Sequence, residues 1–547
     1  MMIRRSFPFL VPVVLLFLLC TASGASAATA TFSSLLKVGS SGAEVTALQK
    51  ALTAQGAYSG PITGQFGSLT QAAVKKFQAA HKIDAVGYTG PATRAALNGL
   101  KAAGTSVTTT AAAPAASSGS SLAAQIAALQ AMVASLQAQL AGGSTSPSTS
   151  VTASTSVKPT PSNGGQFEVS GWIPYWAEAK AVADVTPHLS ELTEINPFGF
   201  SVKTDGTLAD TLNVTDPTWQ ALFAQAHAQG VRVVATVMWS DTGSIHTVLS
   251  NPTLRAQHIQ SIVSTINKYG FDGVDIDYEG KLAADKDNYS AFLRELNAAL
   301  AANGTNKWLE CTIEARTPPD SLNTTVSPSD IQYANDYTVI NQYCDRVRLM
   351  TYDQESADAS LNASHQGQLY SPIADPAWIK KVIALTTQTI DKSKIELGVA
   401  TYGYIYQVMP STDGSSYDYT LLEAFNPAYA TQTAAQYNIM PSRNAAGELS
   451  FTYVPKETVS ALPSNSYLSS LAPSGTDSSN LAAAGALALA KSSAKQSPVQ
   501  LLWWSDAQAI QDKVNLAKQL GLRGVSIFKL DGGEDPNMWN VLSGAKQ

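Results

Sequence analysis

Four carboxylates stand within eight residues of a segment that otherwise has the composition of a buried strand. Residues 271–279 read FDGVDIDYE, in which valine, isoleucine and tyrosine alternate with acidic residues. Because side chains alternate across a strand, Asp275, Asp277 and Glu279 should share one face. Like charges on one face raise one another's pKa, and a carboxyl that stays protonated near neutral pH can act as a general acid. Calcium-binding loops, the alternative, place their ligands on flexible Gly- and Asn-rich turns rather than along a strand.

The segment resembles the DGxDxDxE signature of family 18 glycoside hydrolases, in which it forms the fourth strand of a (β/α)8 barrel. The resemblance implies that Glu279 protonates the glycosidic oxygen. It also implies that the substrate's own 2-acetamido oxygen is the nucleophile, with Asp277 polarising the acetamido group and Asp275 sharing a proton with Asp277. Asp272 has the opposite strand parity, and we expect it to be structural.

A second motif, Met350-Thr351-Tyr352-Asp353, resembles the family's MxYD element at the end of the sixth strand. The resemblance implies that Tyr352 hydrogen-bonds the acetamido carbonyl, that Asp353 contacts the substrate and that Met350 lines the pocket. These three residues join the acidic segment as predicted site residues.

Aromatic residues at strand ends are further candidates for stacking on sugar rings. We expect Trp176, Trp239 and Tyr402 to contact substrate, although a Trp at a strand end is often core packing. Segments within 501–539 resemble the spore-cortex-lytic and related cell-wall branch of the family. That branch has Trp at the end of strand eight as the floor under the scissile sugar, and here Phe528 takes that place.

Strand-like runs alternate with helical patterns from residue 167 onward, which predicts an α/β fold with a parallel sheet and helical crossovers. A TIM barrel over 166–547 is expected, with its chemistry at the carboxyl ends of the strands. A long insertion, roughly 407–498, follows the seventh strand and predicts a small α+β addition. The eight expected strands are 167–176, 194–202, 231–239, 271–279, 308–316, 347–353, 395–404 and 524–530.

The amino-terminal segment 1–27 has the pattern of a cleavable secretory signal. Arg4 and Arg5 precede an apolar run that ends before the small-residue site Ala-Ser-Ala. The run is shorter than a membrane-spanning helix requires, so we expect a secreted or cell-wall protein without a stable membrane span. Cleavage would remove both arginines and change the formal charge from −6 to −8, which does not favour nucleic acid as a partner.

Two cysteines, Cys311 and Cys344, remain after residues 1–27. Export permits a disulfide between them but does not require one. No Cys/His cluster has metal-ligand spacing, so neither a metal nor a cofactor is predicted.

Residues 33–101 contain an internal repeat in which a Gly-rich turn precedes Thr70 and, 23 residues later, Thr93. Each Thr could cap the helix that follows it. Apolar spacing predicts helices over 44–55 and 69–80. The unit resembles the small three-helix peptidoglycan-binding domain, through VTALQKAL and AVKKFQ.

Residues 102–121 and 142–165 are rich in Ser, Thr, Ala and Pro, as flexible linkers are. Between them, 122–141 carries Leu, Ile and Val at 4-3-4-3-4 spacing, the seam of a short coiled coil. The segment could self-associate weakly, and an isolated spacer helix is equally compatible with its length.

Together these features predict an exported glycoside hydrolase that cleaves β-1,4 bonds next to N-acetylglucosamine in peptidoglycan with retention. Glucosaminidase rather than muramidase cleavage is favoured by the branch resemblance alone. A chitinase or chitooligosaccharide hydrolase would use the same residues. A non-catalytic wall-binding protein is the third possibility, because Phe528 departs from the family pattern, but such barrels typically lose the acid that Glu279 retains.

Overall fold

The computed structural model describes most of the chain from residue 165 onward and part of an amino-terminal unit. The described residues are 32, 36–37, 42–58, 62, 66, 68–81, 87–102 and 165–546, the last range without 303–306, 323–326, 328–330 and 456–462. The predicted signal 1–27, the linkers and the coiled-coil segment 122–141 lie outside them. The chain divides into two compact units, residues 1–136 and 137–547.

The amino-terminal unit contains three helices, α1 (Ala43–Ala54), α2 (Ser68–Ala80) and α3 (Pro91–Ala102). Apolar side chains that recur at helical spacing on α1 and α2 form its buried core, together with Phe66 and Leu97. The prediction that the repeated threonines cap the helices was wrong, because both lie inside their helices. Their hydroxyls instead accept hydrogen bonds from glutamines of the preceding helix, Gln49 to Thr70 at 2.9 Å and Gln78 to Thr93 at 2.8 Å.

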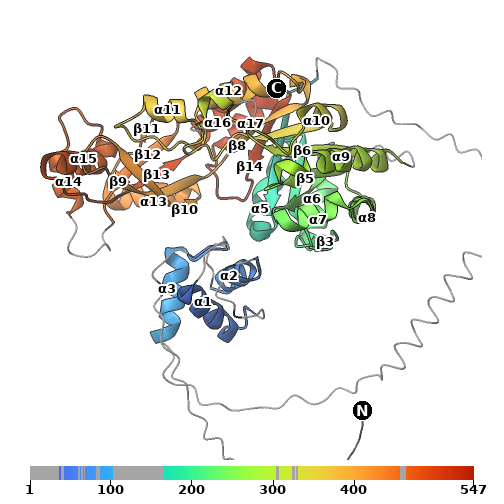
Figure 1. The fold of residues 1–547 in the computed structure, drawn as a ribbon, viewed down its shortest axis with the longest axis horizontal. Coiled ribbons are helices and arrows are strands. Elements are labelled where there is room, and N and C mark those ends of the chain that lie inside the picture. The colour runs from blue at the N-terminus through green and yellow to red at the C-terminus, as the bar shows by residue number, and fades with distance from the viewer. Residues whose placement is uncertain are drawn as a thin grey trace, which may run out of the picture. The chain divides into compact units, whose positions relative to one another are not determined.

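The second unit is a closed barrel of eight parallel strands, as predicted (Figure 1). The strands run in the order β1-β14-β8-β7-β6-β5-β4-β2, and pairing of β1 with β2 closes the ring. A short strand, β3 (Leu208–Asp210), extends β2 antiparallel. The barrel strands are β1 (Glu168–Pro174), β2 (Glu194–Val202), β4 (Arg232–Trp239), β5 (Gly273–Tyr278), β6 (Trp308–Glu314), β7 (Arg346–Met350), β8 (Ile395–Ala400) and β14 (Gly524–Phe528).

Helices surround this ring and bury the apolar outer face of the strands. Three of them begin at an Asp-Pro or Asn-Pro pair, in which Asp216, Asn251 and Asp375 accept hydrogen bonds from backbone N–H groups of the first turn. Such a side chain satisfies donors that the helix itself leaves unpaired. The helices are α5 (Glu178–Val185), α6 (Pro217–Ala228), α7 (Thr242–Ser250), α8 (Pro252–Tyr269), α9 (Lys286–Ala301), α10 (Tyr337–Tyr343), α11 (Ala359–Ser364), α12 (Pro376–Thr386), α16 (Ala507–Leu520) and α17 (Met538–Lys546).

The insertion after β8 forms a five-stranded antiparallel sheet with three helices, seen in orange and red as a lobe beside the barrel (Figure 1). The sheet has the order β10-β9-β13-β12-β11 and extends to residue 504, because the apolar strand β13 pairs with β9 and β12. The elements are β9 (Gly403–Pro410), β10 (Tyr417–Phe425), α13 (Pro427–Tyr437), β11 (Ser442–Arg443), β12 (Leu449–Tyr453), α14 (Asn465–Leu471), α15 (Leu481–Ser493) and β13 (Val499–Trp504).

A disulfide joins Cys311 on β6 to Cys344, two residues before β7. Both cysteines are buried between neighbouring strands of the barrel. Among the helices in the described part of the chain, none is long and apolar enough to cross a membrane.

Candidate active site

The acidic face of β5 points into the barrel, as its alternation predicted. Asp275 is fully buried, and each of its oxygens has two partners. Oδ2 accepts hydrogen bonds from Trp172 Nε1 and Thr236 Oγ1, both at 2.9 Å. Oδ1 accepts one from Thr312 Oγ1 at 2.7 Å and lies 3.4 Å from a guanidinium nitrogen of Arg348. These contacts hold the carboxyl group of Asp275 in one orientation.

Arg348 belongs to a cluster of charges that fills the barrel interior at the level of Asp275 and below. Its guanidinium forms ion pairs with Glu194, Glu310 and Glu396, besides its contact with Asp275. All five side chains are fully buried. Burial raises the pKa of Glu310 and of Glu396 despite the charge of Arg348. Burial also opposes ionisation of Glu194, but its arginine neighbours outweigh this effect and lower its pKa to about 2.

Two more arginines extend this cluster toward the amino-terminal ends of the strands. Arg232 donates to Glu194 at 2.8 Å and to Glu168 at 3.2 Å. Arg346 binds both oxygens of Glu168, at 2.6 and 2.7 Å. Oppositely charged side chains therefore fill the barrel interior, and Arg348 among them contacts Asp275 from the amino-terminal side.

Asp277 lies one inward position farther along β5, and its environment differs from that of Asp275. The residue is 5% exposed, and its Oδ1 is buried without a hydrogen-bond partner among the described residues. Burial, the charge of Glu279 and the charge of Asp275 raise its pKa well above the ordinary range of an aspartate. Two neighbouring carboxyls thus differ in environment, because Asp275 is held by four partners whereas the pKa of Asp277 is raised, which favours its protonated form.

Glu279 follows β5 at the carboxyl end of the barrel and is open to solvent. Its backbone N–H is fixed by the carbonyl of Trp239 at 2.8 Å. Partial burial of its carboxyl and the charge of Glu314 raise its pKa, whereas the charge of Lys281 lowers it. Lys281 is itself held by the carbonyl of Tyr278 and lies 3.4 Å from Glu314. A carboxyl with a raised pKa at an open barrel mouth can serve as a general acid.

Tyr352 and Phe528 form a flat aromatic surface beside these carboxyls. Their rings stack with centroids 5.5 Å apart and an interplanar angle of 15°. Burial, then the charge of Asp277, raises the pKa of Tyr352, so its hydroxyl stays protonated and can donate a hydrogen bond. Gly398 on β8 makes room for the Tyr352 ring, because a Cβ there would lie 2.9 Å from it and 2.3 Å from the carbonyl oxygen of Leu349.

Asp353 follows Tyr352 in the left-handed backbone region, with φ 56°. One of its carboxylate oxygens accepts hydrogen bonds from the hydroxyls of Tyr402 at 2.5 Å and Tyr404 at 2.7 Å. Tyr402 also packs edge-on against Phe528. Asp353, Tyr402 and Phe528 therefore lie together, and Tyr404, two residues beyond Tyr402, is an additional member of the group.

The remaining predicted residues differ in their placement. Met350 is half-buried on β7, on the same inward face as Arg348 and beside the cluster that contains Tyr352. Trp176 contacts Phe198, whose ring packs in turn against Phe528.

Trp239, by contrast, is not part of this group. It pairs in register with Tyr278, on the outward face of the barrel, and is 3% exposed. Its indole nitrogen donates to Ser244 Oγ at 3.0 Å, and its ring packs against His258 and Tyr278. Trp239 is thus a core residue between strands and helices, and we exclude it from the candidate site.

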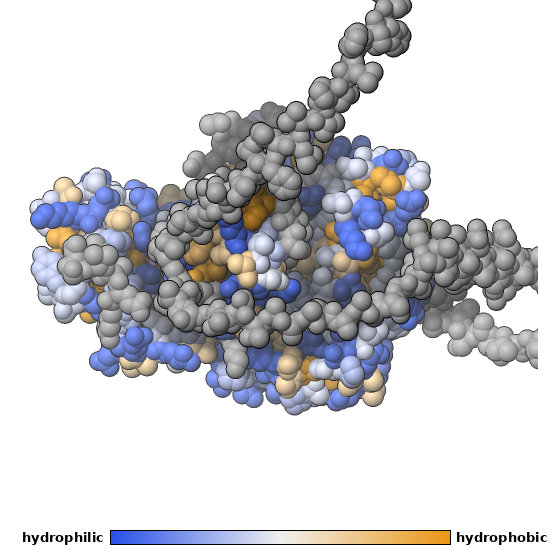
Figure 2. Space-filling view, turned by 90° about the horizontal axis from the view of Figure 1, so that it is seen from below, coloured by the Kyte–Doolittle hydropathy of each residue, from blue (hydrophilic) through white to orange (hydrophobic). Residues whose placement is uncertain are grey.

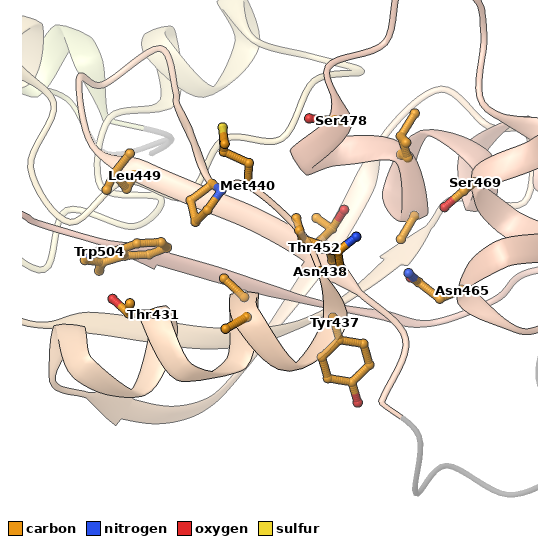
Figure 3. A pocket seen from close by; sticks show the side chains of 16 residues that line it. Thr431, Tyr437, Asn438, Met440, Leu449, Thr452, Asn465, Ser469, Ser478 and Trp504 are labelled. Carbon is orange, nitrogen blue, oxygen red and sulfur yellow. The ribbon is translucent and has the colours of Figure 1, made fainter.

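A pocket of about 820 Å³ also lies in the insertion, and none of the predicted site residues lines it. Figure 3 shows Trp504, Leu449 and Met440 on one side of it and Asn465 and Ser469 on the other. On the face visible in Figure 2, hydrophilic side chains cover most of the coloured surface, and hydrophobic ones occur in small groups. The chemistry-bearing groups gather instead at the barrel mouth.

Comparison with known proteins agrees with this geometry. The family model described as glycosyl hydrolases family 18 matches residues 171–533, and the model of a peptidoglycan binding domain matches residues 41–97. A cortical fragment-lytic enzyme of Bacillus anthracis is 24% identical over 358 residues, which cover 64% of this chain and 67% of the relative. A class V chitinase of Arabidopsis thaliana is 27% identical over 192 residues, covering 34% of this chain and 48% of that protein.

The fold is also that of solved structures. A chitinase from Chromobacterium violaceum superposes with a TM-score of 0.50 at 17% identity, over 69% of this chain and 98% of that one. At this identity the likeness describes the fold of the catalytic unit.

Proposed function

Because the chain belongs to glycosyl hydrolase family 18, we propose that it cleaves β-1,4 bonds next to N-acetylglucosamine in peptidoglycan, with retention of configuration. The observation that carries the proposal is the arrangement at the carboxyl end of β5. A buried Asp277 and an accessible Glu279, both with a raised pKa, lie beside the aromatic surface of Tyr352 and Phe528. A domain of a peptidoglycan-binding family precedes this unit on the same chain.

In the first step, Glu279 donates its proton to the glycosidic oxygen while the bond from that oxygen to the anomeric carbon breaks. The acetamido carbonyl oxygen of the same sugar attacks the anomeric carbon and forms a cyclic oxazolinium. Asp277 accepts a hydrogen bond from the acetamido N–H, and the Tyr352 hydroxyl donates to the acetamido oxygen. Positive charge that develops on the ring is stabilised by the Asp275 carboxyl group, which Arg348, Trp172 and two threonines hold in place.

In the second step, the Glu279 carboxylate removes a proton from a water molecule that attacks the anomeric carbon. The carbon–oxygen bond of the oxazolinium ring breaks, and the acetamido group is regenerated. Two displacements at one carbon give a product with the original β configuration.

The amino-terminal unit would direct this chemistry to the cell wall. Residues 102–165 join it to the barrel, and their composition predicts a tether that raises the effective concentration of the enzyme on its polymer. The proposed substrate requires the protein to act outside the cytoplasmic membrane, for which the predicted signal 1–27 would serve. Its partner is thus a polysaccharide rather than a nucleic acid.

Purified sacculi and colloidal chitin, incubated in parallel with the enzyme, test the substrate. We expect soluble fragments of sacculi that carry N-acetylglucosamine at the new reducing end, identified by borohydride reduction and mass spectrometry. New reducing ends on N-acetylmuramic acid would show that the enzyme is a muramidase rather than a glucosaminidase. Products from chitin alone would favour the second candidate, a chitinase, which relatives named chitinases make reasonable. Binding to sacculi without products from either polymer would contradict both.

Replacement of Asp277 by Asn should lower kcat about a hundred- to thousandfold while KM changes little. The amide still offers an acceptor to the acetamido N–H, but it cannot carry negative charge as a carboxylate can, and this contact strengthens as the acetamido oxygen attacks. Steady-state kinetics on a soluble N-acetylglucosamine oligomer measure the effect.

Asp272→Asn is the matched control within the same acidic segment. Asp272 accepts from the backbone N–H of Val233 at 2.8 Å and pairs with His227 at 2.9 Å, so it ties β5 to β4 outside the barrel. We expect kcat to stay near the wild-type value in this variant. A similar loss of kcat in both variants would remove Asp277 from the mechanism.

The pH dependence should report the charges around Glu279. A general acid must be protonated, so kcat/KM falls as pH rises through the pKa of Glu279. That pKa is raised by burial and by Glu314, so Glu314→Gln should lower it and shift the alkaline limb to lower pH. The pH profile of kcat/KM on a soluble oligomer measures the shift.

Glu295→Gln serves as the control for that profile. Glu295 also pairs with a cation, Arg255, and its side chain has the same 42% exposure as that of Glu314. It lies on α9, outside the barrel mouth. If Glu314→Gln and Glu295→Gln gave the same pH profile of kcat/KM, Glu314 would not affect the pKa of the catalytic acid.

A further inference from the structure

A row of tyrosines leads from the candidate active site into the insertion. Tyr402, Tyr404 and Tyr406 occupy alternate positions at the end of β8 and along β9, so they share one face. Ring centroids are 5.6 Å apart for the first pair and 6.1 Å for the second. Tyr406 then packs edge-on against Tyr419 of the neighbouring strand β10, with centroids 6.0 Å apart. The row begins at Phe528, the predicted floor under the scissile sugar.

The row ends in a pocket of about 390 Å³ between the β9–β10 hairpin and the segment that follows β7. Tyr406, Tyr419 and Tyr370 contribute aromatic surface to it, and Asn362 and Gln368 contribute amides. Aromatic rings with a few amide and hydroxyl groups are the usual lining of a site for a polar ligand with apolar faces, such as a pyranose.

Most polar groups of the pocket wall are already fixed by the protein. The Tyr419 hydroxyl accepts from the backbone N–H of Tyr370 at 2.8 Å. The Tyr370 hydroxyl donates to Asp375 at 2.8 Å, and its ring stacks on His365 with centroids 4.0 Å apart. The wall is therefore rigid before any ligand arrives, which reduces the entropy lost on binding.

Tyr406 is different. Its residue is only 2% exposed, and its hydroxyl has no acceptor of ordinary geometry among the described residues. The neighbouring Ser371 side chain acts to lower its pKa, as a donor to the tyrosine oxygen would. Burial raises its pKa, so the hydroxyl stays neutral and remains a donor. A buried polar group without a partner destabilises a protein by about 1–3 kcal/mol. A ligand oxygen in the pocket would supply the missing acceptor.

We propose that this pocket binds an uncharged N-acetylhexosamine unit of the glycan strand. The tyrosine row connects the pocket to Phe528 and Tyr352 of the candidate active site. That the unit belongs to a strand bound for cleavage rests on the proposed function, although the binding itself does not.

The charges that face the pocket favour a neutral sugar. Glu355 lines it from the segment after β7 and Asp418 from β10, with no lysine or arginine among its described lining residues. These carboxylates would repel a sugar that carries its own carboxylate, such as a muramic acid unit with a free lactyl group. They leave N-acetylglucosamine as the preferred occupant.

Ligand binding to a variant that lacks the catalytic proton donor tests the pocket without cleavage of the ligand. In a Glu279→Gln background, isothermal titration with the dimer and the hexamer of N-acetylglucosamine compares a short ligand with one that can reach the pocket. Tyr406→Phe keeps the ring and removes only the hydroxyl. We expect it to weaken hexamer binding about three- to tenfold, the value of one hydrogen bond, and to leave dimer binding unchanged.

Two further variants make the result decisive. Ser416→Trp should fill the pocket and remove the preference for the hexamer, because the Ser416 side chain lines the pocket. Tyr429→Phe changes an exposed tyrosine of α13 in the same insertion, and it should change the affinity for neither ligand. An unchanged ratio of hexamer to dimer affinity in both Tyr406→Phe and Ser416→Trp would overturn the inference. If pocket-dependent binding appears but wild-type protein cleaves no polymer, the proposed function fails and the pocket stands.

Discussion

Glu279→Gln should lower kcat by at least about a thousandfold on any polymer the enzyme cleaves, within the range expected for loss of a general acid and base. The amide has the shape of the acid but neither donates a proton to the glycosidic oxygen nor accepts one from water. Both chemical steps depend on this one group in the proposed mechanism. Rate measurements on a soluble oligomer at saturating concentration give kcat directly.

Substrate binding should survive the same substitution. Glu279 is exposed at the barrel mouth, and none of the described residues donates a hydrogen bond to its side chain, so the fold and the aromatic surface should stay intact. Titration should therefore give a Kd within about twofold of KM, provided that chemistry is slow relative to dissociation. Wild-type rates from Glu279→Gln, or loss of binding without loss of kcat, would remove Glu279 as the acid.

The second large effect is expected for stability. Arg348→Met should lower the free energy of unfolding of the catalytic unit by about 3–5 kcal/mol, because it leaves several buried carboxylates without their cation. Glu310 and Glu396 would lose their arginine partner inside the barrel, and Glu194 would retain Arg232. All nine tryptophans lie between residues 172 and 539, so their fluorescence in a denaturant titration follows this unit alone.

Arg443→Met is the control for that measurement. Arg443 also forms a bidentate ion pair, in which both contacts to Asp506 are 2.8 Å long, but its side chain is 35% exposed. We expect this substitution to cost less than about 1 kcal/mol. Equal shifts for the two variants would mean that the buried cluster contributes no more than a surface pair.

Alternation along single strands made the barrel and its acidic face predictable. In residues 271–279 the period of two separates apolar from acidic side chains, and the structure keeps that separation. The same rule identifies Trp239 as an outward residue, since it pairs with Tyr278 rather than with Asp277. The pairing of Trp239 with Tyr278 depends on which strands are neighbours in the sheet. The sequence of a single strand does not contain that information.

The cluster of charges inside the barrel could not be predicted from the sequence, for a related reason. Glu194, Arg232, Glu310 and Arg348 are charged residues within strands, which usually indicates a solvent-facing position. Only closure of the sheet turns these positions inward and brings opposite charges within contact distance. The pocket beside Tyr406 likewise depends on Tyr419, which the β9–β10 hairpin brings next to it.

The anomeric configuration of the first product tests the central claim most directly, because retention by the substrate's acetamido group requires the whole arrangement of Glu279, Asp277 and Tyr352. Proton NMR of a cleaved N-acetylglucosamine oligomer, recorded before mutarotation, should show the β anomer at the new reducing end. The matched oligomer without N-acetyl groups should not be cleaved. An α product, or equal cleavage of the deacetylated oligomer, would contradict the mechanism.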